Sequence, residues 1–567
     1  MNSDQNQESI GYLVGGGLKE NFIVRLSIPP EQVQEGAFVV IKSGNWQFYG
    51  LVTDIRLGAT DPRFADEQSE TRLKPDLAKL LHGQTLFTNL DVMPALMLET
   101  GPEFDDPGYQ AWVEKTKDNA PSLLPVKTVP PHHAPVRLAS PGDIAEIFGK
   151  PETPGNFVIG FTREQAHPVC INLDKFILRS SGIFGATGTG KSFLTRIILA
   201  GLIHYNRASV LVFDMHNEYG LDDTASDTGL PVVGLRTRFP SRVRVVGLGQ
   251  GTQIRGYMPD FNLEIAMKDI QPEDIELLTR ELNLKETTPT TLEALVNSFG
   301  KEGWFSAFRE MKYEATIEND EGKKVPAPGS VAAWANEAGV NVNAAQSLHS
   351  KLNRLFNSKY ILEKPAADSV SEIIKALEAG QHIVLSFGDF ETDLDYLLVS
   401  NLLTRRIRDA WEKRTNQYRS TKKGEPRPLV IVLEEAHKLL NPIMASQTTF
   451  SAIAREMRKY YVTLLIVDQR PSQIYDEVMS QLGTRISGWL GDDDDIHAVL
   501  SGLASRDALR GMLARLQPKE EVLLLGWGVP MPLPIRSRRY DQQFWRDLLG
   551  RDNSDISDKR LIEELGF

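Results

Sequence analysis

The fold of this chain is decided by the run Ile183-Phe184-Gly185-Ala186-Thr187-Gly188-Thr189-Gly190-Lys191-Ser192. From Gly185 onward the run fits the phosphate-binding pattern G-x-x-x-x-G-K-[ST]. Glycine lets the main chain wrap an anion where a Cβ would collide. We expect Lys191 to reach the β- and γ-phosphates of ATP, and the Ser192 hydroxyl to complete the coordination of Mg²⁺. The alternative is an ordinary glycine-rich turn that happens to contain a lysine.

The sequence on both sides of this loop predicts a strand–loop–helix unit. The apolar run Phe176-Ile177-Leu178 continues, after a short polar patch, into Ile183-Phe184 and predicts a strand. The run from Phe193 to Ala200 has helical spacing and contains no glycine or proline. Backbone N–H groups and a helix N-terminus would then converge on phosphate oxygens. The predicted nucleotide-binding residues are Gly185, Ala186, Thr187, Gly188, Thr189, Gly190, Lys191, Ser192 and Phe193.

The chain is acidic overall, with 63 basic and 75 acidic residues and a formal net charge of −12. Any contact with nucleic acid therefore requires a local basic patch, such as a groove or the lumen of a ring. Cys170 is the only cysteine, which excludes an intramolecular disulfide and suits a reducing compartment. The polar N-terminus lacks the layout of a secretion signal, and no apolar run approaches the roughly 18 residues of a membrane span. We expect a cytoplasmic protein with no membrane partner.

Short apolar or alternating runs, separated by turn residues, predict a small β-barrel in residues 1–150. The expected strands are Gly11–Val14, Asn21–Leu26, Ala37–Ile41, Trp46–Val52, Leu86–Phe87, Asp91–Met93 and Val136–Leu138. The charged segment 61–79 is expected to be an exposed insertion. The proline-rich segment 121–135 contains His132 and His133, but a stiff surface loop is favoured over a metal site because no further ligands lie nearby.

From about Phe157 strands and helices alternate, which predicts an α/β domain with a parallel sheet. The strand Ser209–Asp214 ends in a carboxylate, and Glu218 lies in the loop that follows. The carboxyl ends of such strands face the ligand crevice, so Asp214 and Glu218 are expected to help hold the magnesium shell or the attacking water. A structural role, for Asp214 as a turn or cap, remains the alternative.

Residues 251–380 are helical and charged in pattern, which predicts an inserted helical subdomain without strands. The expected helices are Glu264–Leu284, Leu292–Phe299, Ala332–Phe356 and Val370–Glu378. The basic cluster of Lys351, Arg354 and Lys359 is expected to be a solvated helix face, with DNA contact as the alternative.

The apolar strand Leu429–Glu434 and the adjacent Glu435 are the expected partners of the phosphate loop. Glu434 would hold the metal through water, and Glu435 would orient and deprotonate the water that attacks the γ-phosphate. Plain surface charge is the alternative for this pair. Gln469, just after the strand Thr463–Val467, is expected to sense the γ-phosphate through its amide.

Arg455 and Arg458 lie one turn apart in a predicted helix, Ser451–Tyr460. Arginine from a neighbouring subunit can neutralise transition-state charge in phosphoryl transfer, so we predict that at least one of the two is such a finger. An ordinary salt bridge is the alternative for either residue.

Toward the C-terminus, Glu521–Trp527 predicts a last strand, and the proline-rich run Val529–Pro534 is expected to form neither helix nor central strand. The run Asp492–Asp495 is expected to be a solvated acidic loop, with a divalent metal site as the alternative. The amphipathic segment Asp541–Phe567 is expected to brace a neighbouring subunit.

Together these motifs resemble HerA, of the HerA/FtsK branch of RecA-like motor ATPases. The residues that carry the resemblance are Gly185–Ser192, Asp214 with Glu218, Glu434-Glu435-Ala436-His437, Ala454–Lys459 and Gln469-Arg470-Pro471-Ser472. The resemblance implies an α/β fold with a barrel at 1–150, a RecA-like core at 151–250 and 381–500, a helical insertion at 251–380, and C-terminal strands and a tail at 501–567. Arg179 lies at the spacing of a further active-site arginine in the family, although the histidine that often follows is absent here.

The resemblance also implies a homohexameric ring that hydrolyses ATP between subunits and moves double-stranded DNA through its lumen. It implies a docked partner, which is a NurA-type nuclease in archaea and a nuclease or sirtuin-like effector of anti-phage defence in bacterial relatives. The alternative is a hexameric ATP-binding scaffold that regulates an effector enzyme and for which DNA movement is secondary.

Overall fold

The computed structural model of the chain describes residues 9–60, 86–102, 104–117, 121–225, 229–313, 316–318, 324–390, 392–444, 448–503 and 506–550. The chain divides into two compact units. The barrel unit comprises Met1–Phe176, Phe184–Lys191 and Gly483–Arg539. The core unit comprises Ile177–Ile183, Ser192–Leu482 and Tyr540–Phe567.

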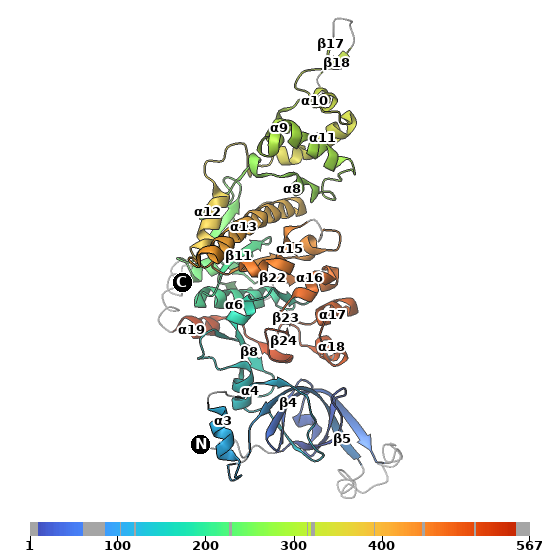
Figure 1. Cartoon of the computed structure of the whole chain (residues 1–567), viewed down its shortest axis with the longest axis vertical. Helices are drawn as coiled ribbons and strands as arrows, with labels where there is room; N and C mark the ends of the chain where they lie inside the picture. Colours follow the sequence, from blue (N-terminus) through green and yellow to red (C-terminus); the bar gives the residue numbers. More distant parts are fainter. Residues whose placement is uncertain are drawn as a thin grey trace. The chain divides into compact units, whose positions relative to one another are not determined.

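The barrel unit begins with antiparallel strands that close on themselves (Figure 1). Their order is β2-β1-β7-β3-β4-β5-β6, and β2 also pairs with β5, which closes the barrel. The strands are β1 (Gly11–Gly15), β2 (Phe22–Leu26), β3 (Phe38–Ser43), β4 (Trp46–Ala59), β5 (Leu86–Glu99), β6 (Leu124–Pro125) and β7 (Pro135–Leu138). The predicted small N-terminal barrel is confirmed; the predicted insertion at 61–79 lies outside the described residues.

The two short runs expected near Leu86 and Asp91 form one long strand, β5, which pairs with β4 along its whole length. The polar residues between the apolar positions have partners across the sheet. Arg25 Nε donates to Asn89 Oδ1 at 2.8 Å, and Arg56 forms an ion pair with Asp91 at 2.8 Å. Because these outward-facing groups are paired, the strand continues through them.

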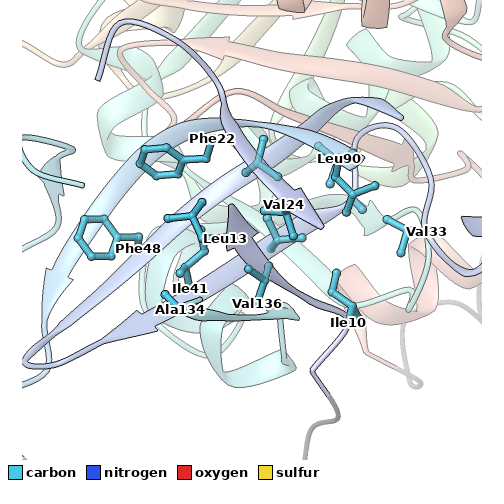
Figure 2. Packing of buried hydrophobic residues seen from close by; sticks show 14 of the residues in the cluster. Ile10, Leu13, Phe22, Val24, Val33, Ile41, Phe48, Leu90, Ala134 and Val136 are labelled. Carbon is cyan, nitrogen blue, oxygen red and sulfur yellow. The ribbon is translucent and has the colours of Figure 1, made fainter. Parts of the chain in front are cut away.

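The barrel interior is filled by apolar side chains that alternate along the strands. Figure 2 shows Leu13, Phe22, Val24, Phe48 and Val136 gathered inside the barrel, and all five are buried. Burying one such side chain contributes about 1.5–3 kcal/mol. The same set fixes the strand register, since a slip by one residue would turn it toward solvent.

The barrel unit also contains a run of strands in the order β23-β24-β25-β8-β9, joined by antiparallel pairs. They are β8 (Asn156–Thr162), β9 (Pro168–Asn172), β23 (Thr484–Ser487), β24 (Glu521–Gly526) and β25 (Leu533–Ser537). Strand β24 confirms the predicted strand at Glu521–Trp527, but it is not the last strand, because β25 follows it. The run Val529–Pro534 was expected to form no central strand. This prediction is wrong for Pro534, which belongs to β25, and β25 lies between β24 and β8. Pairing with β8 starts only at Ile535, so the proline lies near the start of the strand, where a missing N–H is tolerated.

The core unit is built on a largely parallel sheet in the order β15-β14-β20-β11-β21-β22-β10. The strands are β10 (Ser181–Phe184), β11 (Ser209–Asp214), β14 (Val243–Leu248), β15 (Phe261–Leu263), β20 (His382–Ser386), β21 (Leu429–Glu434) and β22 (Val462–Asp468). Strands β11, β21 and β22 are buried along their whole length, as expected for a sheet covered on both faces. The predicted α/β fold with a parallel sheet is confirmed.

The prediction of a strand at Phe176–Leu178 is wrong. This segment contains the end of α5 (Leu173–Ile177), and β10 starts only at Ser181. The buried residues of α5, Leu173 and Phe176, are three positions apart, which is helical rather than strand spacing.

Residues 251–380 differ from the prediction because they contain short strands. These are β15, β16 (Ile265–Ala266) paired with β19 (Ile361–Leu362), and β17 (Thr316–Glu318) paired with β18 (Lys324–Pro326). The expected helix Glu264–Leu284 is replaced by β16, a 3₁₀ turn η4 (Met267–Asp269) and the short α8 (Pro272–Glu276). Pro272 can begin a helix but cannot lie inside one, which limits the helix at that point.

The other helices expected in this segment are present as α9 (Thr288–Glu310), α10 (Val331–Glu337), α11 (Val342–Phe356) and α12 (Ser369–Glu378). The run Ala332–Phe356 is divided between α10 and α11 at Gly339, whose φ is +70°. Asn341 then caps α11 by accepting a hydrogen bond from Ala344 N at 3.0 Å. In Figure 1, α9, α10 and α11 form one group.

The last described helix, α19 (Gln542–Leu549), buries Phe544, Trp545 and Leu548 within the core unit. The ring of Trp545 lies 5.8 Å from that of Phe239. The apolar face of α19 is thus covered by its own chain. The rest of the expected brace, 551–567, lies outside the described residues, and bracing of a neighbouring subunit stays a prediction. Within the described ranges, no helix has both the length and the apolar character needed to cross a bilayer.

Candidate functional site

The glycine loop begins directly after β10 and runs into α6 (Lys191–Tyr205), as the sequence predicts. Gly188 has a φ of +75°, in the left-handed region that favours glycine. A Cβ at Gly185 would lie 2.6 Å from Thr189 Oγ1. A side chain is therefore disfavoured by backbone conformation at Gly188 and by lack of space at Gly185, which leaves the backbone free to approach an anion.

The loop is held in its curve by hydrogen bonds within the barrel unit. The carbonyl of Ala186 accepts from Thr189 Oγ1 at 2.7 Å and from Lys191 Nζ at 2.9 Å. Its N–H donates to Trp489 O at 2.9 Å, and Gly488 N donates to Phe184 O at 2.8 Å. The loop is thus shaped in advance of any ligand.

Helix α6 is buried from Leu194 to Ile203, whereas Ser192 and Phe193, in its first turn, are partly exposed. The buried Arg196 guanidinium lies 5.2 Å from the Phe193 ring centroid and 5.9 Å from that of Tyr219. It also donates to the backbone carbonyl of Glu218 at 3.1 Å. Arg196 therefore connects the helix after the glycine loop to the loop after β11.

Glu434, the last residue of β21, is buried and is held by two tyrosines. Tyr219 OH donates to Glu434 Oε1 at 2.6 Å, and Tyr396 OH donates to its backbone carbonyl at 2.7 Å. Its other oxygen, Oε2, is buried and has no hydrogen-bond partner among the described residues. Burial and the charges of Asp214 and Glu218 raise the pKa of Glu434 well above its usual range.

Asp214 accepts backbone hydrogen bonds from Glu218 N at 2.7 Å and Tyr219 N at 2.9 Å. Burial raises the pKa of Asp214 to about 6, although these N–H groups act in the opposite direction. This is the geometry of a turn cap. Glu218 Oε2 is buried without a hydrogen-bond partner among the described residues. A part for Asp214 or Glu218 in a magnesium shell stays a prediction.

Glu435 lies in the turn between β21 and α14 (His437–Leu440) and has a φ of +46°. Gln469 Nε2 donates to Glu435 Oε1 at 2.7 Å, which places the two predicted residues together. His437 Nδ1 lies 3.0 Å from the buried Asp468 carboxylate and 3.7 Å from Glu435 Oε2. The hydrogen bond to Asp468 raises the pKa of His437.

The predicted helix Ser451–Tyr460 is instead α15 (Thr449–Glu456) followed by a 3₁₀ turn, η5 (Met457–Tyr460). Arg455 faces Glu477 at 3.4 Å, so it has the salt-bridge partner of the alternative interpretation. The side chain of Arg458 is exposed and forms no hydrogen bond or ion pair with any described residue, whereas its backbone carbonyl accepts from Tyr461 N at 3.2 Å. Arg179 lies between α5 and β10, where its predicted role stays a prediction.

The candidate secondary sites have ordinary structural contacts. Lys351 donates to the carbonyl of Asn283, and Arg354 donates to Thr392 Oγ1 at 3.0 Å. Asp492 is the N-cap of α17 (Asp493–Leu500) and accepts from Asp494 N at 2.8 Å. The run Asp492–Asp495 is therefore a helix start rather than a loop.

Residues whose roles were not predicted surround the predicted acids. Tyr219 and Tyr396 donate hydrogen bonds to Glu434, and His437, which is hydrogen-bonded to Asp468, lies 3.7 Å from Glu435 Oε2. Asp468 ends a buried strand as Asp214 does, and that signal could have found it. No sequence pattern identifies the two tyrosines.

The donor set fits a magnesium ion bound mainly through water and phosphate. In the part of the chain that the structure describes, no three His, Cys, Asp or Glu side chains are grouped to hold a metal by themselves. Mg²⁺ usually takes one or two carboxylates and keeps its other positions for water and phosphate. The unpartnered, buried Oε2 of Glu434 is an oxygen of the kind that a hydrated cation would bind.

Comparison with known proteins agrees with this geometry. Residues 157–407 match the family model described as "Helicase HerA, central domain". The chain is 24% identical over 564 residues to the DNA double-strand break repair helicase HerA of Saccharolobus solfataricus, covering 98% of this chain and 96% of that protein. The protein of the same name from Sulfurisphaera tokodaii is 24% identical over 563 residues, again with 98% and 96% coverage.

Solved structures similar to this chain include VirB4 of Thermoanaerobacter pseudethanolicus, at 16% identity and a TM-score of 0.40, covering 68% of this chain and 97% of VirB4. The bacterial conjugative coupling protein TrwBΔN70 gives 13% identity and a TM-score of 0.44, covering 71% of this chain and 92% of TrwBΔN70.

A glycine loop that joins a strand to a helix, with a parallel sheet whose strands end in carboxylates, defines a P-loop ATPase. The chain is thus an enzyme of this class. Residues 157–407 are similar to the central domain of helicase HerA.

Proposed function

We propose that the chain is an ATP-dependent motor that translocates along, and unwinds, double-stranded DNA. The observation that carries this proposal is the match of residues 157–407 to the HerA central domain, together with relatives over nearly the full chain that are named DNA double-strand break repair helicases. The glycine loop and the acidic strand ends supply the chemistry that such a motor needs.

In the proposed reaction, the backbone of Gly185–Gly190 holds the phosphates, and Lys191 neutralises charge on the β- and γ-phosphates. Ser192 and Glu434 are the residues that would hold Mg²⁺, which when bound supplies further neutralisation of phosphate charge. Glu435 takes the proton from the attacking water. Its carboxylate is oriented for this role by Gln469, with which it shares a hydrogen bond of 2.7 Å.

We further propose that the active unit is a homohexameric ring in which an arginine of one subunit reaches the ATP of the next. The exposed Arg458, without an ion pair among the described residues, is better placed for this than Arg455, which faces Glu477. Duplex DNA passes through the lumen. A partner nuclease or sirtuin-like effector docks on the ring in anti-phage defence, and co-purification from the native host tests this part.

The central experiment measures ATP turnover with and without duplex DNA, and ATP-dependent displacement of a third strand from a triplex substrate. We expect duplex DNA to raise turnover severalfold and the wild-type protein to displace the third strand. The Lys191→Ala variant should show neither DNA-stimulated ATP turnover nor strand displacement, because it lacks the cation that neutralises the phosphates. Turnover that does not respond to DNA, with no strand displacement, would refute the motor and leave an ATPase of another role.

A further inference from the structure

The backbone at Glu435 is strained. Its φ of +46° lies in the left-handed region, which is an unfavourable backbone conformation for a glutamate. The residue directly follows the end of β21, and Ala436 alone separates it from the first residue of α14. Contacts elsewhere must hold the chain in this turn.

Asp468 supplies such contacts. It is the last residue of β22, next to Val467, which lies opposite Glu434 in the parallel register. Its side chain is buried, with a residue exposure of 1%. The carboxylate accepts from His437 N at 2.7 Å, His437 Nδ1 at 3.0 Å and Arg470 N at 2.7 Å. Two of these bonds come from the residue that lies two positions after Glu435.

His437 and Gln469 extend this anchor to the Glu435 carboxylate itself. An ionised carboxylate only accepts hydrogen bonds, so Nδ1 of His437 carries the proton that faces Asp468. The same Nδ1 lies 3.7 Å from Glu435 Oε2, while Gln469 Nε2 donates to Oε1 at 2.7 Å. Each carboxylate oxygen of Glu435 therefore lies near a side chain tied to the end of β22.

We propose that Asp468 and His437 are positioning residues for ATP hydrolysis, which hold the strained turn and aim the Glu435 carboxylate at the attacking water. This inference rests on the proposed function, in which Glu435 is the base. A merely structural pair would affect stability and leave the turnover of folded protein unchanged. A positioning pair lowers kcat and leaves the KM for ATP nearly constant, because the glycine loop that binds the phosphates is untouched.

The test compares His437→Asn with His437→Gln in the full chain, since the amide nitrogen of asparagine can occupy the place of Nδ1 and that of glutamine the place of Nε2. We expect His437→Asn to keep most of kcat, and His437→Gln and Asp468→Asn to lose about tenfold to a hundredfold. The KM for ATP should stay within about twofold. His497→Gln, on the exposed face of α17, is the matched control and should behave as wild type.

Equal kcat values for the two His437 variants, or wild-type kcat in Asp468→Asn, would overturn the inference. Thermal melting of each variant identifies any that fails to fold, and the His437 pair leaves the buried Asp468 intact. The variant Glu435→Gln distinguishes failure of the positioning role from failure of Glu435 as the base. Loss of hydrolysis in Glu435→Gln with normal kcat in His437→Gln removes only the positioning role, whereas normal hydrolysis in Glu435→Gln removes both the base and its positioning.

Discussion

At the scale of single residues, the two candidate arginine fingers differ in their surroundings. Arg455 already faces Glu477 at 3.4 Å, whereas Arg458 is exposed and free of ion pairs among the described residues. We expect Arg458→Ala to lower ATP turnover by about 10³, the scale of a lost finger. Arg455→Ala, the matched control, loses an exposed salt bridge worth about 0–1 kcal/mol. Steady-state ATP hydrolysis measures both, and the opposite ranking would reassign the finger to Arg455.

His382, at the start of β20, is a buried imidazole whose ring nitrogens have no hydrogen-bond partner among the described residues. Burial, reinforced by Arg427 and Arg242, lowers the pKa of His382 from 6.5 to about 3. Between pH 6.5 and about 3, His382 is therefore protonated in the unfolded chain and stays neutral in the folded chain. The stability that His382 contributes is therefore complete above pH 6.5 and falls toward pH 3, by about 1.4 kcal/mol per pH unit at most.

His382→Phe should flatten the dependence of stability on pH in this window, because it removes the titrating group and keeps a ring of similar shape. Urea-unfolding midpoints of wild type and variant, measured between pH 4 and 8, test this. At pH 8 the unfolding midpoint of the variant should equal or exceed that of the wild type, and the variant's advantage should grow as the pH falls. Parallel curves across the whole range would contradict the prediction.

The sequence predicts those site residues whose expected role follows from a local pattern. Gly185 to Ser192 and the pair Glu434-Glu435 were predicted, because glycines before a lysine and acids after an apolar strand are local signals. The contact between Tyr219 and Glu434 joins residues 215 positions apart, and no local pattern encodes it. Likewise, Asp468 reaches His437 only because β21 and β22 are neighbours in the sheet.

At the scale of elements, Asp492 offers a test of the acidic run at the start of α17. Its carboxylate accepts from Asp494 N at 2.8 Å and Asp495 N at 3.3 Å, which is a helix cap. Asp492→Ala should cost about 1 kcal/mol, and Asp492→Asn much less, because asparagine also caps well. Hydrogen exchange of the α17 amides measures the loss. A chelator should not change it; a chelator effect as large as that of Asp492→Ala would favour a metal site.

The strands were predicted more closely than the helices of residues 251–380. The buried strands β11, β20, β21 and β22 are nearly continuous apolar runs, so the ends of each run in the sequence predict the ends of the strand. The expected helix Glu264–Leu284 failed because the chain there forms β16, η4 and the short α8, and Pro272 cannot lie inside a helix. Hydrophobic periodicity alone does not locate such breaks within a run of helical spacing.

At the scale of the whole molecule, the proposed ring predicts the mass of the assembly. Six copies of a 63.3 kDa chain give about 380 kDa, which mass photometry with and without ATP should detect. Mixing Glu435→Gln chains with Arg458→Ala chains should restore part of the ATP turnover, because some interfaces then combine an intact base with an intact finger. A single-chain mass under all conditions would refute the ring.

The attachment of the glycine loop to Trp489 has a practical consequence. Because the Ala186 N–H donates to the Trp489 carbonyl at 2.9 Å, and the Trp489 indole donates to Ala514 O at 3.1 Å, any rearrangement of the loop should disturb this chromophore. We therefore expect Trp489 to act as a native fluorescent reporter of nucleotide binding. The difference in emission between wild type and Trp489→Phe would isolate it from the chain's other tryptophans and time each turnover without an attached dye.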